Sequence, residues 1–303
     1  PLKCSYSMKN THLEHPEDLI LTGKLDVIES LYSVADISLK IDGAPSIVWG
    51  FHPHNGRFFV GTKSVFNKKK IKICYTQDDV FALYDETTHA NVIEILCACL
   101  DYLPRRKGIY QGDFIGFGGS STYKPNTLKY DFGTKVRNKI IIAPHTRYII
   151  EGEMCDAVAY PLQSYFVDTP EVKWVQPIVD RIMVENAPPT INISKVQFMS
   201  HSEASIAKKS INQLIRDGIE LTDGELLEIL GCIYLVNLYQ FVIELKQEVM
   251  ESFIIYGTPK CYLPNGDKVA GEGFVLSNEF GMFKLVDRTT FTHANMNEGR
   301  FVR

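Results

Sequence analysis

The fold is decided by Ile37-Ser-Leu-Lys-Ile-Asp-Gly-Ala-Pro45. Apolar and polar residues alternate up to Lys40, which predicts a strand with one buried face. Gly43 and Pro45 predict a turn directly after this strand. Strand-like sequences at 45–51 and 57–62 flank an Asn-Gly turn, so we expect a β-hairpin immediately downstream of Lys40.

The sequence on both sides of this hairpin predicts an α+β fold. A helix is expected over 16–33, and a second helix over 91–103 should end before Pro104. The glycines and serines of 117–125 predict a loop. Further strands are expected at 108–115, 128–132, 140–143, 147–154, 260–263, 273–276 and 281–286.

A helical segment is expected to interrupt these strands. Ser200 with Glu203, and Thr222 with Glu225, have the spacing of capping boxes, and Gly218 predicts the end of the first helix. The second helix is expected from Asp223 to near Ile255. We therefore expect one domain of antiparallel sheets with helices, formed by residues 1–198 and 257–303. Residues 199–256 should form a helical insertion before the last strands.

Composition narrows the class of protein. The 303 residues carry a net charge of −4, with 45% hydrophobic and 22% charged residues, as in ordinary soluble proteins. Affinity for nucleic acid must therefore come from local patches. The seven cysteines form neither a zinc motif nor a disulfide framework, which favours a reducing cytosol.

Membrane association is not expected. The first residues show no signal peptide, and the apolar stretch 229–243 is shorter than the roughly 20 residues of a membrane span. This stretch is expected to be a buried helix or a docking surface for a protein partner. The predicted location is the cytoplasm.

Lys40-Ile-Asp42-Gly43 places a lysine at a strand end, followed by an acid and a turn glycine. A lysine attacks phosphorus only as the neutral amine, so a nucleophilic lysine needs burial or nearby cations that lower its pKa from about 10.4. An ordinary exposed lysine before a turn would give the same four residues. This run alone leaves both interpretations open.

A basic segment follows the hairpin. Between Arg57 and Lys72 there are six basic residues and no acidic residue, with Phe58, Phe59 and Phe66 among them. Lysines neutralise phosphates and aromatic rings stack on bases, so the segment suits a nucleotide or a nucleic acid. A solvated charged loop is the alternative. A second group of cations comprises Lys124, Lys129, Lys135, Arg137 and Lys139.

Two charged residues near the C-terminus could contact the same nucleotide as Lys40. Glu272 lies between Gly271 and Gly273 at the start of a predicted strand, where a backbone without side chains can approach a nucleotide or a metal closely. Lys284 lies on the next predicted strand. A lysine there could neutralise a phosphate.

Five short motifs occur in a characteristic order: Lys40-Ile-Asp-Gly43, Gly61-Thr-Lys-Ser64, Gln111-Gly-Asp-Phe114, Glu272-Gly-Phe-Val275 and Phe283-Lys-Leu285. This set resembles the covalent nucleotidyltransferases, which are the ATP-dependent DNA ligases, RNA ligases and mRNA capping enzymes. The chain also resembles an uncharacterised group of tailed-phage proteins with a ligase-like core. That second likeness includes Thr11-His-Leu-Glu-His-Pro-Glu-Asp18, Pro125-Asn-Thr127, Pro144-His-Thr-Arg-Tyr148 and Lys284-Leu-Val-Asp-Arg288. The resemblance covers nearly all of the chain outside the helical segment.

The resemblance implies a ligase-type adenylation fold and a role for each matching residue. Lys40 would attack the α-phosphate of ATP and form a lysyl-AMP intermediate. Asp42 and Gly43 would shape the turn and orient the acceptor. Lys284 would offset the charge of the α-phosphate. Further nucleotide contacts are expected from Lys63, Phe66, Asp113 and Glu272, and Mg²⁺ or Mn²⁺ would bind at Asp113, Glu153 or Glu272.

The sequence departs from the family pattern in three places. The third motif usually has Glu, whereas this chain has Asp113 in Gln-Gly-Asp; Glu153 in Glu-Gly-Glu is the alternative for that role. The last motif often has a second lysine, where Val286 stands here, and Arg288 is a possible substitute. Only 19 residues follow Lys284, so no C-terminal oligonucleotide-binding barrel is expected. This favours an RNA ligase-like over a DNA ligase-like architecture.

The histidines have less specific interpretations. His12 and His15 lie with Glu14, Glu17 and Asp18 at one helix start, which suits either a metal site or a capped surface helix. His145 is expected to be a structural or pocket residue rather than a catalytic base.

The leading hypothesis is an enzyme that transfers AMP from Lys40 to a nucleic-acid 5′-phosphate before strand sealing. A nucleotidyltransferase with a protein or small-molecule acceptor is the first alternative. A non-catalytic phage module that binds nucleotide or nucleic acid is the second. Sequence leaves open whether the nucleotide is ATP or GTP and whether the acceptor is RNA or DNA.

Overall fold

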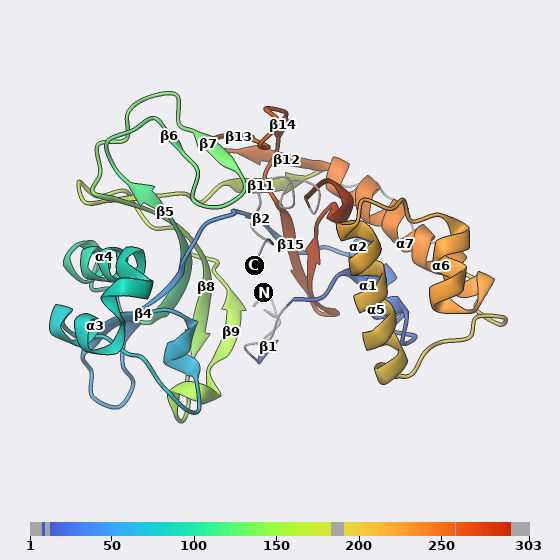
Figure 1. Cartoon of the computed structure of the whole chain (residues 1–303), viewed down its shortest axis with the longest axis horizontal. Helices are drawn as coiled ribbons and strands as arrows, with labels where there is room; N and C mark the ends of the chain where they lie inside the picture. Colours follow the sequence, from blue (N-terminus) through green and yellow to red (C-terminus); the bar gives the residue numbers. More distant parts are fainter. Residues whose placement is uncertain (1–7, 10–12, 183–190, 258, 292–303) are drawn as a thin grey trace.

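Figure 1 shows the computed structural model, which describes residues 8–9, 13–182, 191–257 and 259–291. A β-rich part and a helix-rich part lie on either side of strand β2 (Asp36–Lys40). The strand pairs are antiparallel except for one described parallel pair, β8 with β10. In the described ranges no sheet closes into a barrel. These features confirm the expected mixture of helices and antiparallel sheets.

The largest sheet has seven strands in the order β1-β9-β8-β5-β3-β4, and β10 pairs with β8 outside this path. The hairpin of β3 and β4 confirms the one expected after Lys40. The strands expected at 140–143 and 147–154 are replaced by the single long strand β8, which spans 140–149; residues 150–154 lie outside it. The seven strands are β1 (Met8–Lys9), β3 (Ser46–Phe51), β4 (Phe58–Gly61), β5 (Ile109–Phe117), β8 (Ile140–Ile149), β9 (Val158–Pro161) and β10 (Val172–Trp174).

Two helices cover one face of this sheet, α3 (Gln77–Leu83) and α4 (Glu86–Tyr102). A capping box of Thr76 and Asp79 starts α3, and the Asp85 side chain caps α4. Helix α4 confirms the expected helix and ends before Pro104, whereas α3 was not expected. Because strand residues alternate between faces, the opposite face carries Ser46, Gln111 and Asp113.

A three-stranded sheet with the order β16-β15-β2 forms the centre of the molecule. Strand β2 comes from the first third of the chain, whereas β15 (Gly273–Asn278) and β16 (Gly281–Leu285) come from its end. All three strands agree with the expected positions. Distant parts of the sequence therefore meet in this sheet.

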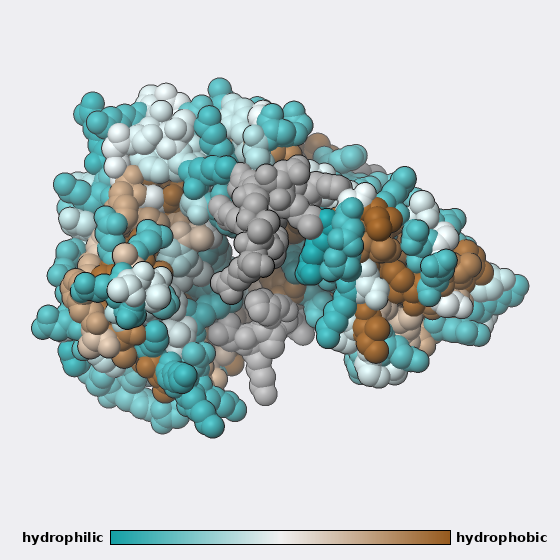
Figure 2. All heavy atoms as spheres, in the orientation of Figure 1, coloured by the Kyte–Doolittle hydropathy of each residue, from teal (hydrophilic) through white to brown (hydrophobic). Residues whose placement is uncertain are grey.

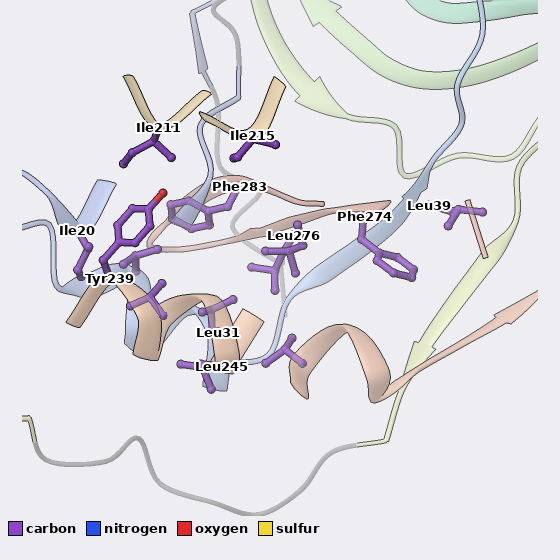
Figure 3. Close-up of a cluster of buried hydrophobic side chains, with 14 of the residues drawn as sticks. Ile20, Leu31, Leu39, Ile211, Ile215, Tyr239, Leu245, Phe274, Leu276 and Phe283 are labelled. Atoms are coloured by element: carbon purple, nitrogen blue, oxygen red, sulfur yellow. The ribbon is translucent and has the colours of Figure 1, made fainter. Parts of the chain in front are cut away.

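Five helices pack against one face of the three-stranded sheet. In Figure 3, Leu39, Phe274, Leu276 and Phe283 from the strands meet Ile211, Ile215, Tyr239 and Leu245 from the helical segment. These side chains belong to one continuous core, so the helical segment shares its core with the strands. The helices are α1 (Pro16–Ile20), α2 (Asp26–Tyr32), α5 (His201–Arg216), α6 (Asp223–Leu230) and α7 (Ile233–Glu251).

Glycines divide two of the expected helices. The expected helix over 16–33 is two helices, because Gly23 adopts a left-handed conformation between them (φ 79°). The expected helix from Asp223 to near Ile255 is also two helices. Gly231 caps the end of α6 with φ 70°, and α7 ends at Glu251. The expected capping box of Ser200 and Glu203 starts α5, and Thr222 is the N-cap of α6, where its side chain accepts a hydrogen bond from the Glu225 N–H.

The remaining strands form two small sheets. One has the order β14-β13-β7-β6, with β6 (Thr122–Tyr123), β7 (Lys129–Asp131), β13 (Lys260–Tyr262) and β14 (Lys268–Val269). The other pairs β11 (Ile178–Arg181) with β12 (Phe253–Tyr256), where the sequence predicted the end of a helix. Two short 3₁₀ helices complete the described elements, η1 (Lys63–Phe66) and η2 (Met154–Asp156).

The apolar stretch 229–243 lies mostly in α7. Its side chains are largely buried in the core, and the exposed apolar residues of this helix are Ile233 and Tyr234 at its start. Among the described helices, none combines the length and apolar character needed to cross a membrane.

A buried ion network fastens the helical segment to the rest of the chain. Glu17 accepts a hydrogen bond from the Lys246 ammonium at 2.7 Å, and Arg288 donates to Asp18 at 2.8 Å. The Lys246 ammonium also donates to the Val286 carbonyl at 3.0 Å. The network therefore joins α1, α7 and the segment that follows β16.

Candidate active site

Lys40 is the last residue of β2 and lies beside the first residue of β15, because the register pairs Lys40 with Gly273. Its ammonium forms an ion pair with the Glu272 carboxylate. The side chains of Lys40 and Glu272 are 35% and 22% exposed, so both are accessible to a small molecule while partly shielded from water. The structure thus brings together two residues that lie 232 positions apart.

Asp42 is a fixed, buried element of this site. Its carboxylate accepts hydrogen bonds from the backbone N–H groups of Thr127 (2.7 Å) and Leu128 (3.0 Å) and from the Asn126 amide. Its own N–H donates to the Tyr130 hydroxyl at 2.6 Å. Both carboxylate oxygens and the N–H of Asp42 therefore hold the chain after Lys40 against the segment 126–130.

Gly43 allows the turn to approach β5 closely. A Cβ at this position would lie 2.6 Å from the Cβ of Asp113 and 2.9 Å from the carbonyl oxygen of Phe114. The Ala44 N–H donates to the same Phe114 carbonyl at 3.0 Å. Any side chain at position 43 would push the turn away from Asp113.

Lys284 lies on the same face of the three-stranded sheet as Lys40. The register pairs Ser38 with Val275 and Val275 with Lys284, and Lys40 is two residues beyond Ser38 on that face. Burial lowers the pKa of the Lys284 ammonium, although nearby Asp18 opposes the shift. Its backbone N–H donates to the Glu14 carbonyl at 3.1 Å, which fixes the strand.

Glu272 is a carboxylate with a perturbed environment. Burial raises the pKa of Glu272, and the Lys40 ammonium opposes this shift. Asp42 and Asp113 act in the same direction as burial. Four charged side chains therefore influence one another around the end of β2.

Asp113 lies on β5 of the seven-stranded sheet, next to Gly43 in the turn after Lys40. Its neighbour on β8 is His145. His145 Nε2 lies 3.6 Å from Asp113 Oδ1, and His145 Nδ1 lies 2.7 Å from the Thr146 hydroxyl. The register passes from Gln111 opposite Thr146 to Gly112 opposite Pro144, so His145 is the extra residue of a β-bulge. Bulges commonly redirect a side chain beside a functional site. The expectation that His145 is a structural or pocket residue stays a prediction.

Lys63 begins η1 at the same end of the seven-stranded sheet. Gly61 pairs with Val48, two residues from Ser46, and Ser46 pairs with Asp113. The Lys63 side chain is exposed. No hydrogen bond or ion pair is recorded for this side chain among the described residues.

Two predicted residues occupy other environments. The Phe66 ring is buried against Tyr148, with ring centroids 4.4 Å apart, inside a small core with Val48 and Phe59. Glu153 is exposed at the start of η2, beyond the end of β8 where Tyr148 pairs with Ile109. This is the end of the sheet opposite Asp113, so Asp113 rather than Glu153 lies with Lys40.

The donors of the site suit a metal that also binds phosphate. In the part of the chain that the structure describes, no three His, Cys, Asp or Glu side chains form a metal site by themselves. Mg²⁺ typically takes one or two carboxylates together with substrate phosphates and water. Glu272 fits this role, with Asp113 as a second carboxylate across the turn. Glu153 lies at the other end of the seven-stranded sheet from Asp113.

Arg288 has a structural environment. It donates to Asp18, to the Tyr239 hydroxyl at 3.2 Å and to the Asn212 amide, and its side chain is 9% exposed. All of its partners belong to the buried network. The proposed substitution of Arg288 for a second phosphate-binding lysine is therefore not supported.

His15 and its acidic neighbours do not form the surface helix that the sequence allowed. Glu17 and Asp18 are buried, and the His15 Nδ1 atom is buried without a hydrogen-bond partner. Burial lowers the pKa of His15, and the charges of Arg288 and Lys284 add to the shift, so this imidazole is neutral. His12 lies outside the described residues.

Several residues of the site carried no separate functional signal in the sequence. Asn126 and Thr127 belong to a motif of the phage resemblance, but their contact with Asp42 could not be inferred. Tyr130 was predicted only as a strand residue. Their roles depend on the position of β7 beside the turn, which is a tertiary contact.

Comparisons with known proteins give a family without an assigned activity. No curated protein and no solved structure matches the chain significantly. The model of a family of unknown function, DUF6267, matches residues 10–228 and 227–300. The match extends through β2, the turn after Lys40, β15 and β16. The chain therefore belongs to this family of unknown function.

Proposed function

We propose that this protein is an ATP-dependent nucleotidyltransferase that first transfers AMP to its own Lys40. The observation that carries the proposal is the ion pair of Lys40 with Glu272 at the end of β2, with Lys284 on the same face of the three-stranded sheet as Lys40. The ordered motifs that resemble covalent nucleotidyltransferases contain these same residues.

The reaction would begin when Lys40 separates from Glu272 and acts as a free amine. Lys40 Nζ would form a bond to the α-phosphorus while the bond to the pyrophosphate oxygen breaks, and the amine proton would pass to solvent. The positive charge of Lys284 would offset charge on the α-phosphate. Asp42 would keep the backbone after Lys40 in position.

Glu272 and Asp113 are the carboxylates that would hold Mg²⁺ or Mn²⁺. The metal would neutralise phosphate charge during the transfer. Lys63 would contact the nucleotide or acceptor phosphate from the seven-stranded sheet. Phe66 and Glu153 are left out of the proposed site because of their positions.

We further propose that the acceptor of AMP is the 5′-phosphate of a nucleic acid, which is then joined to a 3′-hydroxyl. RNA ligase-like chemistry is favoured by the resemblance. This second step rests on the likeness to ligases and on the basic segments, whereas the proposed self-adenylylation is supported by the arrangement of Lys40 and Glu272.

Self-adenylylation can be tested directly. The protein is incubated with α-labelled ATP and Mg²⁺, denatured, and analysed for label that remains on the chain; α-labelled GTP serves as a parallel sample. We expect acid-labile label from ATP, which is absent in Lys40→Ala and retained in Lys209→Ala, since Lys209 is an exposed lysine of α5. Well-folded protein without label from either nucleotide would contradict the proposal.

The acceptor is tested with the labelled protein. Addition of nicked RNA, nicked DNA or a hybrid should release AMP and join the strands if the enzyme is a ligase. Release without joining, or transfer to a protein, would support a nucleotidyltransferase with another acceptor.

A further inference from the structure

The small four-stranded sheet places two lysines on either side of a tyrosine. Tyr262 on β13 pairs with Lys129 on β7 and with Lys268 on β14. Residues in register point to the same face of a sheet, so these three side chains form one row across three strands. Lys129 and Lys268 are exposed, and Tyr262 is half-buried.

This row lies on the outer face of the sheet. The next register pair, Tyr130 and Cys261, points to the other face, where both side chains are 1% exposed. Because side chains alternate along a strand, Lys129 and Tyr262 must point away from that core. Figure 2 shows mainly hydrophilic and neutral surface over β13 and β14 at the top of the molecule.

Further cations lie around the row. Lys260 is exposed on β13, and exposed Lys135, Arg137 and Lys139 follow β7. This segment stays beside β6, because the backbone N–H groups of Phe132 and Val136 donate to the carbonyls of Ser121 and Ser120. Asp131 lies opposite Lys260 in the register and accepts a hydrogen bond from the Gly133 N–H, and Asp267 accepts one from the Asn265 amide.

Such a surface matches the chemistry of a single-stranded nucleic acid. Lysines neutralise successive phosphates, and an accessible aromatic ring stacks on a base that is not held in a duplex. The whole chain is acidic, with a net charge of −4, so this positive charge is a local property of the sheet. A patch for general solubility would not require the central ring.

The surface is also joined to the Lys40 site by the backbone. Leu128, which donates to the Asp42 carboxylate, is followed directly by Lys129. Lys268 precedes Glu272 by four residues. Even a fully extended chain of this length spans at most roughly 14 Å. Two short segments of chain therefore join the row to the Lys40 site.

We infer that the outer face of β7, β13 and β14, with Lys129, Tyr262 and Lys268 in its centre, binds the single-stranded end of a nucleic-acid acceptor. The inference rests on the proposed function, since it identifies where the acceptor of AMP binds. It adds residues from the C-terminal third to the basic residues near 129 that the sequence had suggested.

Binding is measured with fluorescent 5′-phosphorylated 12-nucleotide oligouridine and oligothymidine by anisotropy at several salt concentrations. Replacing Lys129, Lys260 and Lys268 with alanine should reduce the salt dependence of log K by about 2, since each phosphate contact contributes about 0.7. Tyr262→Ala should weaken binding roughly 5- to 150-fold through lost stacking, and Tyr262→Phe should restore it. Lys209→Ala serves as the matched control.

Inorganic polyphosphate separates a nucleic-acid site from a general anion surface. We expect it to compete weakly and to bind Tyr262→Ala as well as the unaltered protein. Equal binding of the oligonucleotides to all variants would overturn the inference, as would an equal loss of polyphosphate and oligonucleotide binding in Tyr262→Ala. Comparison of oligouridine with oligothymidine identifies the preferred strand.

The same variants are assayed for label from ATP, which separates this inference from the proposed function. Loss of oligonucleotide binding with retained Lys40 labelling would support both proposals. If the unaltered protein takes up no label but the variants still lose oligonucleotide binding, the proposed function fails and the binding surface stands.

Discussion

At the scale of one residue, the buried ammonium of Lys284 lowers the stability of the folded protein. Burial lowers the pKa of its ammonium in the folded protein, whereas the unfolded chain keeps the ordinary value of 10.5. Below the folded pKa, the charged side chain therefore reduces the stability of the fold. As pH rises from there towards 10.5, the unfolded state binds more protons and stability increases.

Lys284→Met should consequently lose labelling by ATP while its melting temperature at pH 7 stays equal or rises. The methionine fills similar volume without a charge that must be desolvated. Thermal unfolding and labelling of the same sample measure the two effects. The stability gain should shrink as pH rises above the folded pKa of Lys284. A clearly lower melting temperature of Lys284→Met at pH 7 would contradict the view that burial of the Lys284 ammonium destabilises the fold.

Asp42, in contrast to Lys284, stabilises the fold, because its carboxylate accepts hydrogen bonds from Asn126, Thr127 and Leu128. Asp42→Ala would leave the buried N–H groups of Thr127 and Leu128 without an acceptor, at about 1–3 kcal/mol for each donor. We expect a lower free energy of unfolding in urea and a loss of labelling. The control Asp180→Ala removes an exposed carboxylate from β11 and should change neither quantity.

At the scale of the element, the turn between β2 and β3 depends on close packing against β5. Gly43→Ala would place a methyl group 2.6 Å from Asp113 Cβ and 2.9 Å from a backbone oxygen. We expect a destabilisation of about 1–3 kcal/mol, as for other overpacked sites, and reduced labelling by ATP.

Gly224→Ala is the matched control, because only one atom lies within 4 Å of the added Cβ, at 3.8 Å. This glycine lies inside α6, where alanine favours the helix by about 1 kcal/mol. Its variant should be as stable as the unaltered protein or more so. Equal behaviour of the two variants in urea would show that the turn does not require glycine for space.

At the scale of the whole molecule, buried charges connect the helical segment to the sheet that carries Lys40 and Lys284. Lys246→Met would leave the fully buried Glu17 carboxylate without its closest cation. Removing one partner of a buried ion pair costs about 3–5 kcal/mol, whereas replacing both partners with apolar residues is often neutral. The variant Glu17→Leu combined with Lys246→Met should therefore recover much of the stability that Lys246→Met loses in urea.

The shared core predicts that the helical segment does not fold as a separate unit. Calorimetry of the full chain should show one cooperative transition, because Ile211, Ile215 and Tyr239 pack with Phe274 and Phe283. A well-separated second transition, assigned to α5–α7 by proteolysis, would contradict this expectation.

The sequence predicted the elements whose signals are local. Strand β2 was placed correctly because apolar and polar residues alternate before Lys40, and α5 was placed correctly because Ser200 and Glu203 form a capping box. The helix breaks at Gly23 and Gly231 were missed. The neighbouring sequence does not show whether a glycine adopts a left-handed conformation or continues a helix. Strand β12 was assigned to a helix because its pairing with β11 is not local.

The sequence by itself determined the order of the motifs and therefore the proposed group of Lys40, Asp42, Glu272 and Lys284. Only the tertiary structure decided which other residues join them. It brings Asp113 and His145 to the turn, places Phe66 in a core and Glu153 at the far end of the sheet, and uses Arg288 for the buried network. The physical reason is that residue types and spacing specify local conformation, whereas the register of distant strands and the burial of charges depend on how those elements pack.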